Sequence, residues 1–226
     1  MSMVFTSTTT ANSSLTKQLV EIKGIGPERA KDLIKAGVKK ISDLKREKYN
    51  KLLSDEARLF VQLNPLNKIP NADIKTLEPY ILRAIPNAVL VGSYRRGKPF
   101  SSDIDVMVVS DDSNALNTAF EKLTHVFDKL YVYSKGPDKM SLILQFNGSA
   151  YKMDVFRTAV EDSTAMLLYS TGSKEFNVSQ RSRAKKLGYL LNQKGLFKNG
   201  VRIPLSTERD YFDTLQMPYK TPSERV

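Results

Sequence analysis

Residues 89–110 read VLVGSYRRGKPFSSDIDVMVVS, and this stretch determines the fold class that the sequence predicts. One apolar strand stops at a Gly-Ser pair, and a second strand follows that carries Asp103 and Asp105. Side chains two residues apart on a strand point to the same side, roughly 6.6–7 Å apart along it. The two carboxylates therefore share one face, while Ile104 and Val106 pack against the other. Two acids this close repel each other unless a cation lies between them, so the stretch predicts a metal site.

Magnesium suits this pair of acids, because it prefers oxygen ligands and leaves coordination positions open for phosphate oxygens. The alternative is a solvent-exposed strand edge on which the two acids have no function. The apolar residues on both sides of the pair argue against that alternative, because they indicate a strand that packs into a core.

The turn before the acids has the residues of a phosphate-binding loop. Gly92 lets the backbone approach a ligand closely, and the hydroxyl and amide of Ser93 can bond a phosphate oxygen. Arg95 and Arg96 follow, and a guanidinium matches phosphate bidentately. The Gly-Ser pair with an Asp-hydrophobic-Asp eleven residues on resembles the signature of the nucleotidyltransferase superfamily, which includes poly(A) polymerases, CCA-adding enzymes and antibiotic nucleotidyltransferases.

Sites of that superfamily need a third acid on a neighbouring strand. Asp154 lies in the alternating stretch AYKMDVFR (150–157), and it is the candidate on a strand of the right type and order. The alternative is a surface acid without function. We expect Asp103, Asp105 and Asp154 to form one catalytic and metal-binding triad.

Composition limits the partners. The chain has 226 residues, a formal net charge of +11 and a pI of about 9.6, which indicates a polyanionic partner, either nucleic acid or an acidic membrane surface. No run of eighteen apolar residues and no secretory signal are found. The absence of cysteine excludes disulfides, thiolate zinc sites and a cysteine nucleophile.

The hydrophobic periodicity predicts an α+β chain of four parts. They are a flexible Ser/Thr-rich tail (1–14), a helical subdomain (15–65), a subdomain with a mixed β-sheet and helices (66–160) and a C-terminal subdomain (161–226). The strands of the mixed sheet are expected at 88–92, 103–109, 128–134, 140–147 and 150–157. The helices after the first subdomain are expected at 72–85, 113–124, 161–170, 174–187 and 207–214, with a turn at 192–200.

The stretch IKGIGPERAKDLIKAGV (22–38) has the form of a helix-hairpin-helix. Gly24 and Gly26 let the backbone turn tightly, and Pro27 fits the first turn of a helix. Amides at that helix start form a sequence-independent phosphate site, and Lys23 adds positive charge. The alternative is a packing unit that touches no nucleic acid.

Four motifs in the same order resemble the family X DNA polymerases, the group that includes DNA polymerase beta. Residues 92–106 resemble its active-site motif, and residues 24–44 its second hairpin. YSTGSKEFNVSQR (169–181) resembles its Y-F-T-G-S motif, and residues 195–226 its closing segment. The resemblance covers about residues 18–226 and implies a nucleotidyltransferase palm.

The resemblance implies two-metal phosphoryl transfer with magnesium, for which manganese can substitute. Asp103 and Asp105 would bind both ions, and Asp154 would bind the catalytic ion and accept the proton of the primer 3′-hydroxyl. Lys152 points to the same face as Asp154, where the family often has arginine, and would lie near the primer terminus. Backbone carbonyls of the hairpin can also hold a monovalent cation.

The resemblance also assigns nucleotide and template contacts. The residues at family positions that hold phosphates are Gly92, Ser93, Arg96, Ser101 and Ser102. Ser102 would act through its backbone amide. Tyr169 and Gly172 occupy the family positions that lie along the sugar of the nucleotide. Asn177 occupies the position that contacts the incoming base, and Arg181 the position that contacts the template strand. Tyr169 could instead belong to a helix core. Ser170 replaces a bulky aromatic residue of the family, which leaves the choice between ribose and deoxyribose open.

The expected function is template-directed filling of short gaps in DNA repair, by a monomer that uses deoxynucleoside triphosphates on gapped or nicked duplex DNA. The protein would be intracellular, in nucleus or cytoplasm, or in a viral factory if viral, with no membrane partner. Only about twenty residues precede the hairpin, where the family usually has a lyase domain, so no 5′-deoxyribose phosphate lyase activity is expected. The alternatives are a template-independent terminal transferase and an inactive DNA-binding scaffold.

Overall fold

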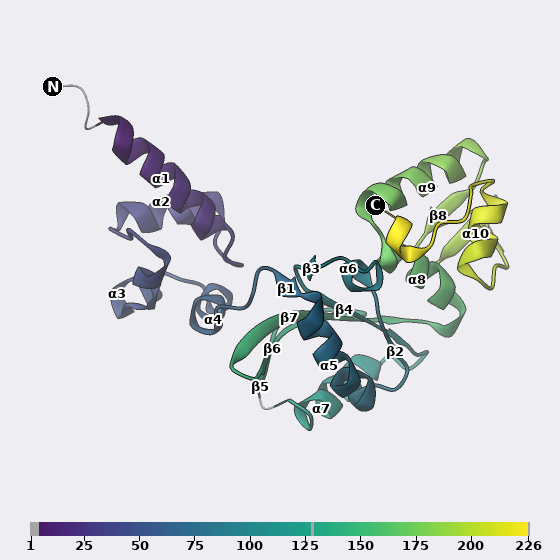
Figure 1. The fold of residues 1–226 in the computed structure, drawn as a ribbon, viewed down its shortest axis with the longest axis horizontal. Coiled ribbons are helices and arrows are strands. Elements are labelled where there is room, and N and C mark those ends of the chain that lie inside the picture. The colour runs from purple at the N-terminus through teal and green to yellow at the C-terminus, as the bar shows by residue number, and fades with distance from the viewer. Residues whose placement is uncertain (1–4, 128, 226) are drawn as a thin grey trace. The chain divides into compact units, whose positions relative to one another are not determined.

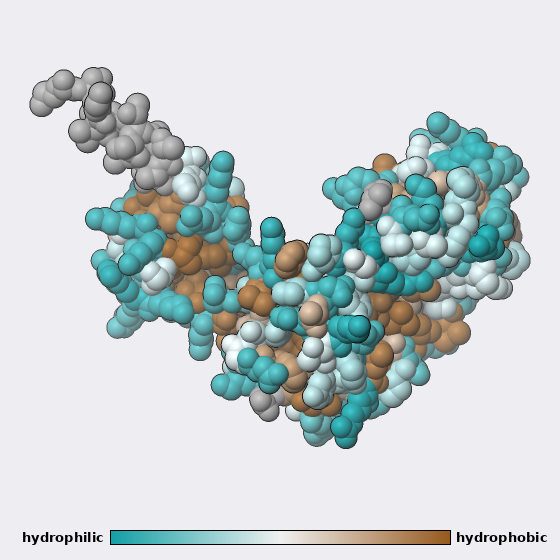
Figure 2. All heavy atoms as spheres, in the orientation of Figure 1, coloured by the Kyte–Doolittle hydropathy of each residue, from teal (hydrophilic) through white to brown (hydrophobic). Residues whose placement is uncertain are grey.

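The computed structural model describes residues 5–127 and 129–225, and the chain divides after Pro65 into two compact units (Figure 1). Hydrophilic residues cover much of the visible surface of each unit (Figure 2). Within the described ranges no helix combines the length and the apolar character that crossing a membrane requires. Each unit has a hydrophobic core of its own.

The first unit is entirely helical in its described part. Its elements are α1 (Phe5–Val20), α2 (Pro27–Lys35), the 3-10 helix η1 (Ile41–Lys45), α3 (Glu47–Asn50) and α4 (Asp55–Leu63). Gly26 is the N-cap of α2 and Pro27 begins it, where a missing N–H removes no hydrogen bond. Gly24 has φ +85°, and a Cβ there would lie 3.0 Å from the amide nitrogen of Ala57. The hairpin turn therefore packs against the start of α4, and only glycine fits.

The start of the chain differs from the expected flexible tail. Residues 1–4 lie outside the described residues. Phe5–Ser14, which were expected to be part of the tail, form the first part of helix α1. Leu15 and Leu19 are buried in the core of the unit and anchor that end. Extending an anchored helix costs much less than nucleating one, so a Ser/Thr-rich segment can follow its neighbour into a helix.

The second unit begins with a palm built on a five-stranded sheet. Its elements are β1 (Ile69–Pro70), α5 (Asn71–Ala84), β2 (Ala88–Leu90), α6 (Gly92–Arg95), β3 (Phe100–Ser101), β4 (Ile104–Val109), α7 (Ala115–Thr124), β5 (Lys129–Lys135), β6 (Lys139–Phe146) and β7 (Ser149–Thr158). The strand order is β2-β4-β7-β6-β5, with β4 and β7 parallel and the other pairs antiparallel. The predicted mixed sheet is thus confirmed.

Helices α5 and α7 cover one face of this sheet (Figure 1). The apolar side chains of the two helices share a core with alternate residues of the strands. The helices contribute Ile74, Leu77 and Leu123, and the strands contribute Ile104, Val106, Leu142 and Val155. Because one face of each strand is committed to this core, its remaining side chains point to the opposite face. That opposite face carries the acidic residues.

The C-terminal part of the second unit joins helices to a small sheet. Its elements are η2 (Val160–Asp162), α8 (Ser163–Thr171), α9 (Lys174–Lys186), β8 (Leu190–Asn192), β9 (Gly195–Lys198), β10 (Val201–Ile203), α10 (Glu208–Thr214) and η3 (Pro222–Glu224). The strand order is β10-β9-β8. The expected turn at 192–200 therefore contains all of β9, because strands of three or four residues are too short to show a periodicity.

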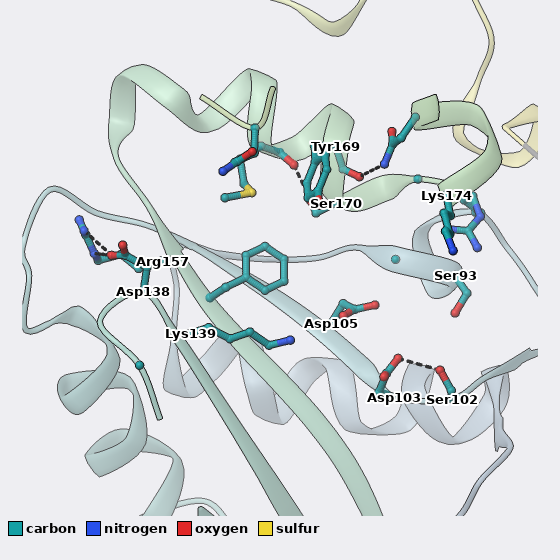
Figure 3. A pocket seen from close by; sticks show the side chains of 18 of the residues that line it. Ser93, Ser102, Asp103, Asp105, Asp138, Lys139, Arg157, Tyr169, Ser170 and Lys174 are labelled. Atoms are coloured by element: carbon teal, nitrogen blue, oxygen red, sulfur yellow. Dashed lines mark hydrogen bonds and ion pairs between the residues drawn. The ribbon is translucent and has the colours of Figure 1, made fainter. Parts of the chain in front are cut away.

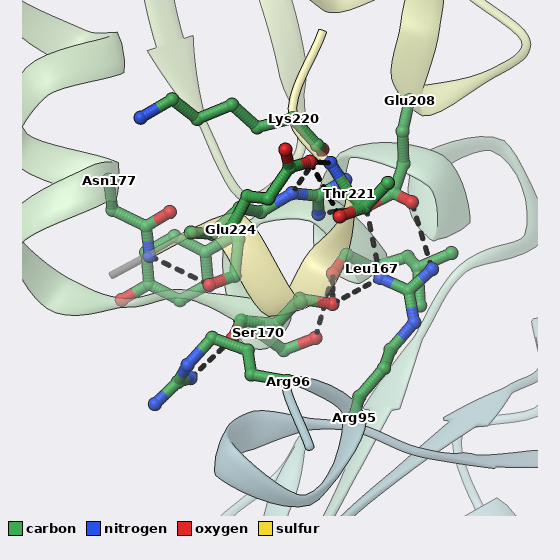
Figure 4. Close-up of polar contacts among 12 residues, drawn as sticks. Arg95, Arg96, Leu167, Ser170, Asn177, Glu208, Lys220, Thr221 and Glu224 are labelled. Atoms are coloured by element: carbon green, nitrogen blue, oxygen red, sulfur yellow. Dashed lines mark hydrogen bonds and ion pairs between the residues drawn. The ribbon is translucent and has the colours of Figure 1, made fainter. Parts of the chain in front are cut away.

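A buried charge network ties this part to the palm (Figure 4). Glu208 Oε2 lies 2.8 Å from Arg95 Nη2, and Glu208 Oε1 lies 2.5 Å from Arg225 Nη1. Arg225 is fully buried and packs against the rings of Phe176 and Phe212. Burial alone would raise the pKa of Glu208, but the hydrogen bonds from Arg95 and Arg225 outweigh it and lower that pKa.

Replacing Glu208 should destabilise the second unit. Glu208→Gln leaves buried arginine charge without its carboxylate, so we expect the free energy of unfolding to fall by about 3–5 kcal/mol. Because pairing lowers the pKa of Glu208, its contribution is present above the ordinary value of 4.5 and disappears as pH falls through the lower folded value. Urea unfolding at neutral and acid pH measures both effects.

The matched control is Glu161→Gln, which removes an ion pair with Arg202 whose carboxylate side chain is 76% exposed. That change should cost at most about 1 kcal/mol. Equal losses for the two variants would contradict a stabilising role for the buried network.

Candidate active site

The parallel strands β4 and β7 bring two of the predicted acids side by side. Asp105 and Asp154 are register partners, and Asp103 stands one residue before β4 begins at Ile104. Ile104 is fully buried on the core side, so the acids lie on the other face of the sheet. Figure 3 shows the carboxylates of Asp103 and Asp105 together in the cleft on that face. The backbone register thus collects acids that are about fifty residues apart in the chain.

Asp105 sits in the most unfavourable position for a negative charge. Burial, followed by the carboxylate charges of Asp103 and Asp154, raises its pKa to about 7, against the opposing charges of Lys139 and Arg96. A cation near Asp105 would offset both the cost of burying its negative charge and the repulsion from the other two carboxylates.

Gly92 makes this position possible. It has φ +61°, and a Cβ there would lie 1.9 Å from Asp105 Oδ2. The Gly-Ser turn and the carboxylate of Asp105 are therefore packed directly against each other.

A cleft of about 960 Å³ opens over the acids, between the palm and the helices α8 and α9 (Figure 3). The sequence-predicted residues that line it are Gly92, Ser93, Arg96, Ser102, Asp103, Asp105, Tyr169, Gly172, Asn177 and Arg181. Three predicted residues of the second unit do not line it: Ser101, Lys152 and Asp154. The hairpin residues Lys23, Gly24 and Gly26 are exposed in the first unit.

The Gly-Ser turn, which was expected to bind phosphate, differs in one detail from the expectation. Ser101 is buried, and its hydroxyl accepts a hydrogen bond of 2.7 Å from the Ser93 hydroxyl. Ser93 therefore lines the cleft, whereas Ser101 contacts the Ser93 hydroxyl from the buried side of the turn. This placement follows from the short pairing of β3 with β1, in which Ser101 lies opposite Ile69.

Arg96 links the same turn to α8. Its Nη1 donates to the backbone carbonyl of Thr171 at 2.5 Å, while its Nε is buried without a partner among the described residues. Burial lowers the pKa of Arg96, and the charges of Asp105 and Glu175 oppose this effect. A buried donor without a partner costs free energy.

The opposite wall of the cleft comes from α8 and α9. Asn177 Nδ2 donates to the backbone carbonyl of Tyr169 at 2.7 Å (Figure 4). Ser170 Oγ donates to the backbone carbonyl of Met166 at 2.6 Å. Tyr169 is 43% exposed, so it does not belong to a helix core. Phe176, in contrast, is buried and stacks on another ring of the core. The tyrosine and the amide therefore face the cleft together.

Sequence reasoning missed two residues that hold Asp154. Ser141 Oγ donates to Asp154 Oδ1 at 2.5 Å, and Lys139 Nζ lies 2.7 Å from Asp154 Oδ2. Burial alone would lower the pKa of Lys139, but Asp154, Asp105 and Asp103 raise it. The signal in the sequence was a polar residue at 139 and 141 within an apolar strand, and it became interpretable only with the register of β6 on β7.

The donor chemistry of Asp103, Asp105 and Asp154 fits a hard divalent cation, because all three offer carboxylate oxygens. In the described ranges, no three acidic, histidine or cysteine side chains converge into a ready-made metal cluster. Both oxygens of Asp154 have partners instead, in Ser141 and Lys139.

Comparisons with known proteins agree with this architecture. Residues 68–157 match the family model described as DNA polymerase beta palm, and residues 166–226 match that described as DNA polymerase beta thumb. Repair DNA polymerase X of African swine fever virus is 28% identical over 142 residues in two isolates, which is 62% of this chain and 82% of the relative. A Leishmania infantum polymerase beta ternary P/T complex superposes with a TM-score of 0.79 at 24% identity, over 96% of this chain and 99% of that one.

Gly92→Ala should damage the site more than the fold. The new Cβ would force the Asp105 carboxylate away, so we expect Mn²⁺ affinity, measured by calorimetry, to fall at least about tenfold. Gly97→Ala is the matched control, because Gly97 has φ +70° but a Cβ there would meet nothing within 4 Å. Both variants should lose about 1–2 kcal/mol of stability from the left-handed backbone. Equal Mn²⁺ affinities in the two variants would refute the close packing of Gly92 on Asp105.

Proposed function

Because the chain belongs to the family X DNA polymerases and is a DNA-directed DNA polymerase, we propose that it fills short gaps in DNA by two-metal phosphoryl transfer. The observation that carries the proposal is the register of Asp105 with Asp154, next to Asp103 and opposite the Gly-Ser turn. Paired carboxylates facing a phosphate-binding turn suit nucleotidyl transfer.

In this proposal the side chains of the cleft divide the work. Asp103, Asp105 and Asp154 would hold two magnesium ions, which when bound supply Lewis-acid stabilisation of the phosphates and a lowered pKa for the primer 3′-hydroxyl. Ser93 and Arg96 bind the outer phosphates of the nucleotide. The 3′-oxygen forms a bond to the α-phosphorus, the bond to pyrophosphate breaks, and Asp154 accepts the proton.

The α8–α9 wall would test the shape of the new base pair. Tyr169 and Gly172 lie along the sugar, Asn177 contacts the incoming base, and Arg181 contacts the template. Minor-groove acceptors are similar in all correct pairs, so such contacts select pair geometry and not a particular base. The exposure of Tyr169 and its hydrogen bond with Asn177 support this role.

Template-directed synthesis is favoured over terminal transfer by the link between β5 and β6. The terminal transferases among the family X polymerases carry a long insertion at this link, and that insertion occludes the template. Here β5 ends at Lys135 and β6 begins at Lys139, and the amide of Gly136 donates to the carbonyl of Lys139 at 2.7 Å. The turn is therefore too short to occlude a template strand.

The first unit supplies a second contact with DNA in this proposal. Lys23 and the amides after Gly24 and Gly26 would bind a backbone phosphate, with a monovalent cation as a bridge. The net charge of +11 supports gapped or nicked duplex DNA as the partner. The protein would act as an intracellular monomer, in nucleus or cytoplasm.

We also propose that residues 13–65 of the first unit have no lyase activity. A lysine that forms a Schiff base needs burial or a neighbouring cation to lower its pKa. Every lysine in residues 13–65 is solvent-exposed. Borohydride reduction on an incised abasic site should therefore trap no covalent adduct, whereas DNA polymerase beta, run in parallel, reports on the assay. A clear adduct would reject this part of the proposal.

Primer extension on a duplex with a one-nucleotide gap tests the polymerase assignment. With magnesium and single deoxynucleotides, only the nucleotide complementary to the template base should be added. Asp154→Ala should lower the rate by about 10²–10⁴-fold, because it removes a metal ligand and the proton acceptor. Asp213→Ala, an exposed acid on α10, is the control and should retain wild-type activity. Addition irrespective of the template base would point to terminal transfer, and full activity of Asp154→Ala would remove Asp154 from the mechanism.

A further inference from the structure

Strand β6 engages both oxygens of the Asp154 carboxylate. Ser141 is the direct register partner of Asp154, and Lys139 lies two residues before it on β6. Ser141 Oγ donates to Oδ1 at 2.5 Å, and Lys139 Nζ contacts Oδ2 at 2.7 Å. Met140 is buried in the core on the other face, so Lys139 and Ser141 belong to the face that carries the acids. Asp154 thus has one neutral partner and one cationic partner.

The two partners differ in their access to water. Ser141 is 8% exposed, so its hydrogen bond to Oδ1 is shielded from competition by solvent. The side chain of Lys139 is 58% exposed, and its ammonium can be hydrated as soon as it leaves Oδ2. Exposed ion pairs are weak because water screens them. The contact at Oδ2 is therefore the one that a stronger cation can replace.

The charges around Asp154 favour such a replacement. Asp103 and Asp105 share the face of the sheet with Asp154, and the carboxylate charges of all three act on Lys139. A single ammonium compensates only part of this negative charge, whereas a divalent cation carries twice as much. The long side chain of Lys139 lines the cleft and can swing into it (Figure 3).

We propose that Ser141 is a positioning residue that orients Asp154 through Oδ1, and that Lys139 is a resident cation which the catalytic metal must displace from Oδ2. The inference rests on the metal assignment made under the proposed function. In the metal-free protein Lys139 offsets the repulsion among the acids. On metal binding Ser141 keeps the carboxylate in place while Lys139 releases it.

Binding of Mn²⁺ to the protein without DNA or nucleotide tests this inference, with free Mn²⁺ measured by electron paramagnetic resonance. Lys139→Ala should bind Mn²⁺ about two- to fivefold more tightly than the wild type, because the competing cation is gone. Lys139→Arg should not show this gain. Ser141→Ala should bind about tenfold more weakly, and Ser141→Thr should restore the wild-type value because it keeps the hydroxyl.

Lys135→Ala is the matched control for loss of one positive charge. Lys135 lies on the same hairpin, but its ammonium contacts Asn117 and not the acids. Its Mn²⁺ affinity should stay close to that of the wild type, and circular dichroism checks that each variant is folded. If Lys135→Ala tightens binding as much as Lys139→Ala, the gain is a general charge effect and the inference is wrong.

The remaining outcomes separate the inference from the proposed function. Weaker or unchanged binding in Lys139→Ala would overturn the role of Lys139, and unchanged binding in Ser141→Ala, or no rescue by Ser141→Thr, would overturn that of Ser141. Asp154→Ala is included in the same series. If it weakens binding while the β6 variants behave as the wild type, the metal site stands and the inference fails. If Asp154→Ala has no effect on binding, the metal assignment itself fails.

Discussion

Repulsion among three carboxylates is the constraint on which the rest of the active site depends. Hydrophobic packing against α5 and α7 commits one face of β4 and β7 to the core, and the parallel register then sets Asp105 beside Asp154 on the other face. The free energy of the core thus holds together charges that would otherwise separate. Burial, followed by the charges of Asp103 and Asp154, raises the pKa of Asp105 to about 7. The positive charges of Lys139 and Arg96 oppose this rise.

The neighbours act through different chemistry. Lys139 contributes a mobile positive charge, Ser141 a neutral hydrogen bond, and Gly92 the space in which the Asp105 carboxylate fits. Arg95 and Arg96 follow each other directly but perform separate tasks. Arg95 is locked into the network with Glu208, whereas Arg96 spans the cleft to the end of α8 and keeps one buried donor without a partner among the described residues. The segment that follows the Gly-Ser turn is therefore tied to the C-terminal part of the unit through both arginines.

Much of this site could be predicted from the sequence, because alternation along a strand assigns each side chain to a face. Asp103 and Asp105 were placed on one face in that way, and Asp154 was chosen because the resembling superfamily needs a third acid on a neighbouring strand. The five palm strands were predicted at nearly the observed positions. The contacts of Lys139 and Ser141 depend on the antiparallel register of β6 on β7, which no local pattern specifies. The same limit explains why the sequence did not predict β8, β9 and β10. These short segments are strands because they pair with one another, and their composition does not reveal it.

The acids also pose a problem for the substrates that the family uses. DNA and nucleoside triphosphates are polyanions, and the carboxylates of Asp103 and Asp105, which line the cleft, repel them at short range. The net charge of +11 attracts them over longer distances, but salt screens that attraction beyond about 10 Å. In the proposed mechanism, cations at the acids would reconcile the two effects, because they would convert a repulsive centre into one that binds phosphate oxygens. An ammonium on β6 can begin this conversion without metal, but its single charge and weak hold on Asp154 leave room for a divalent ion to complete it.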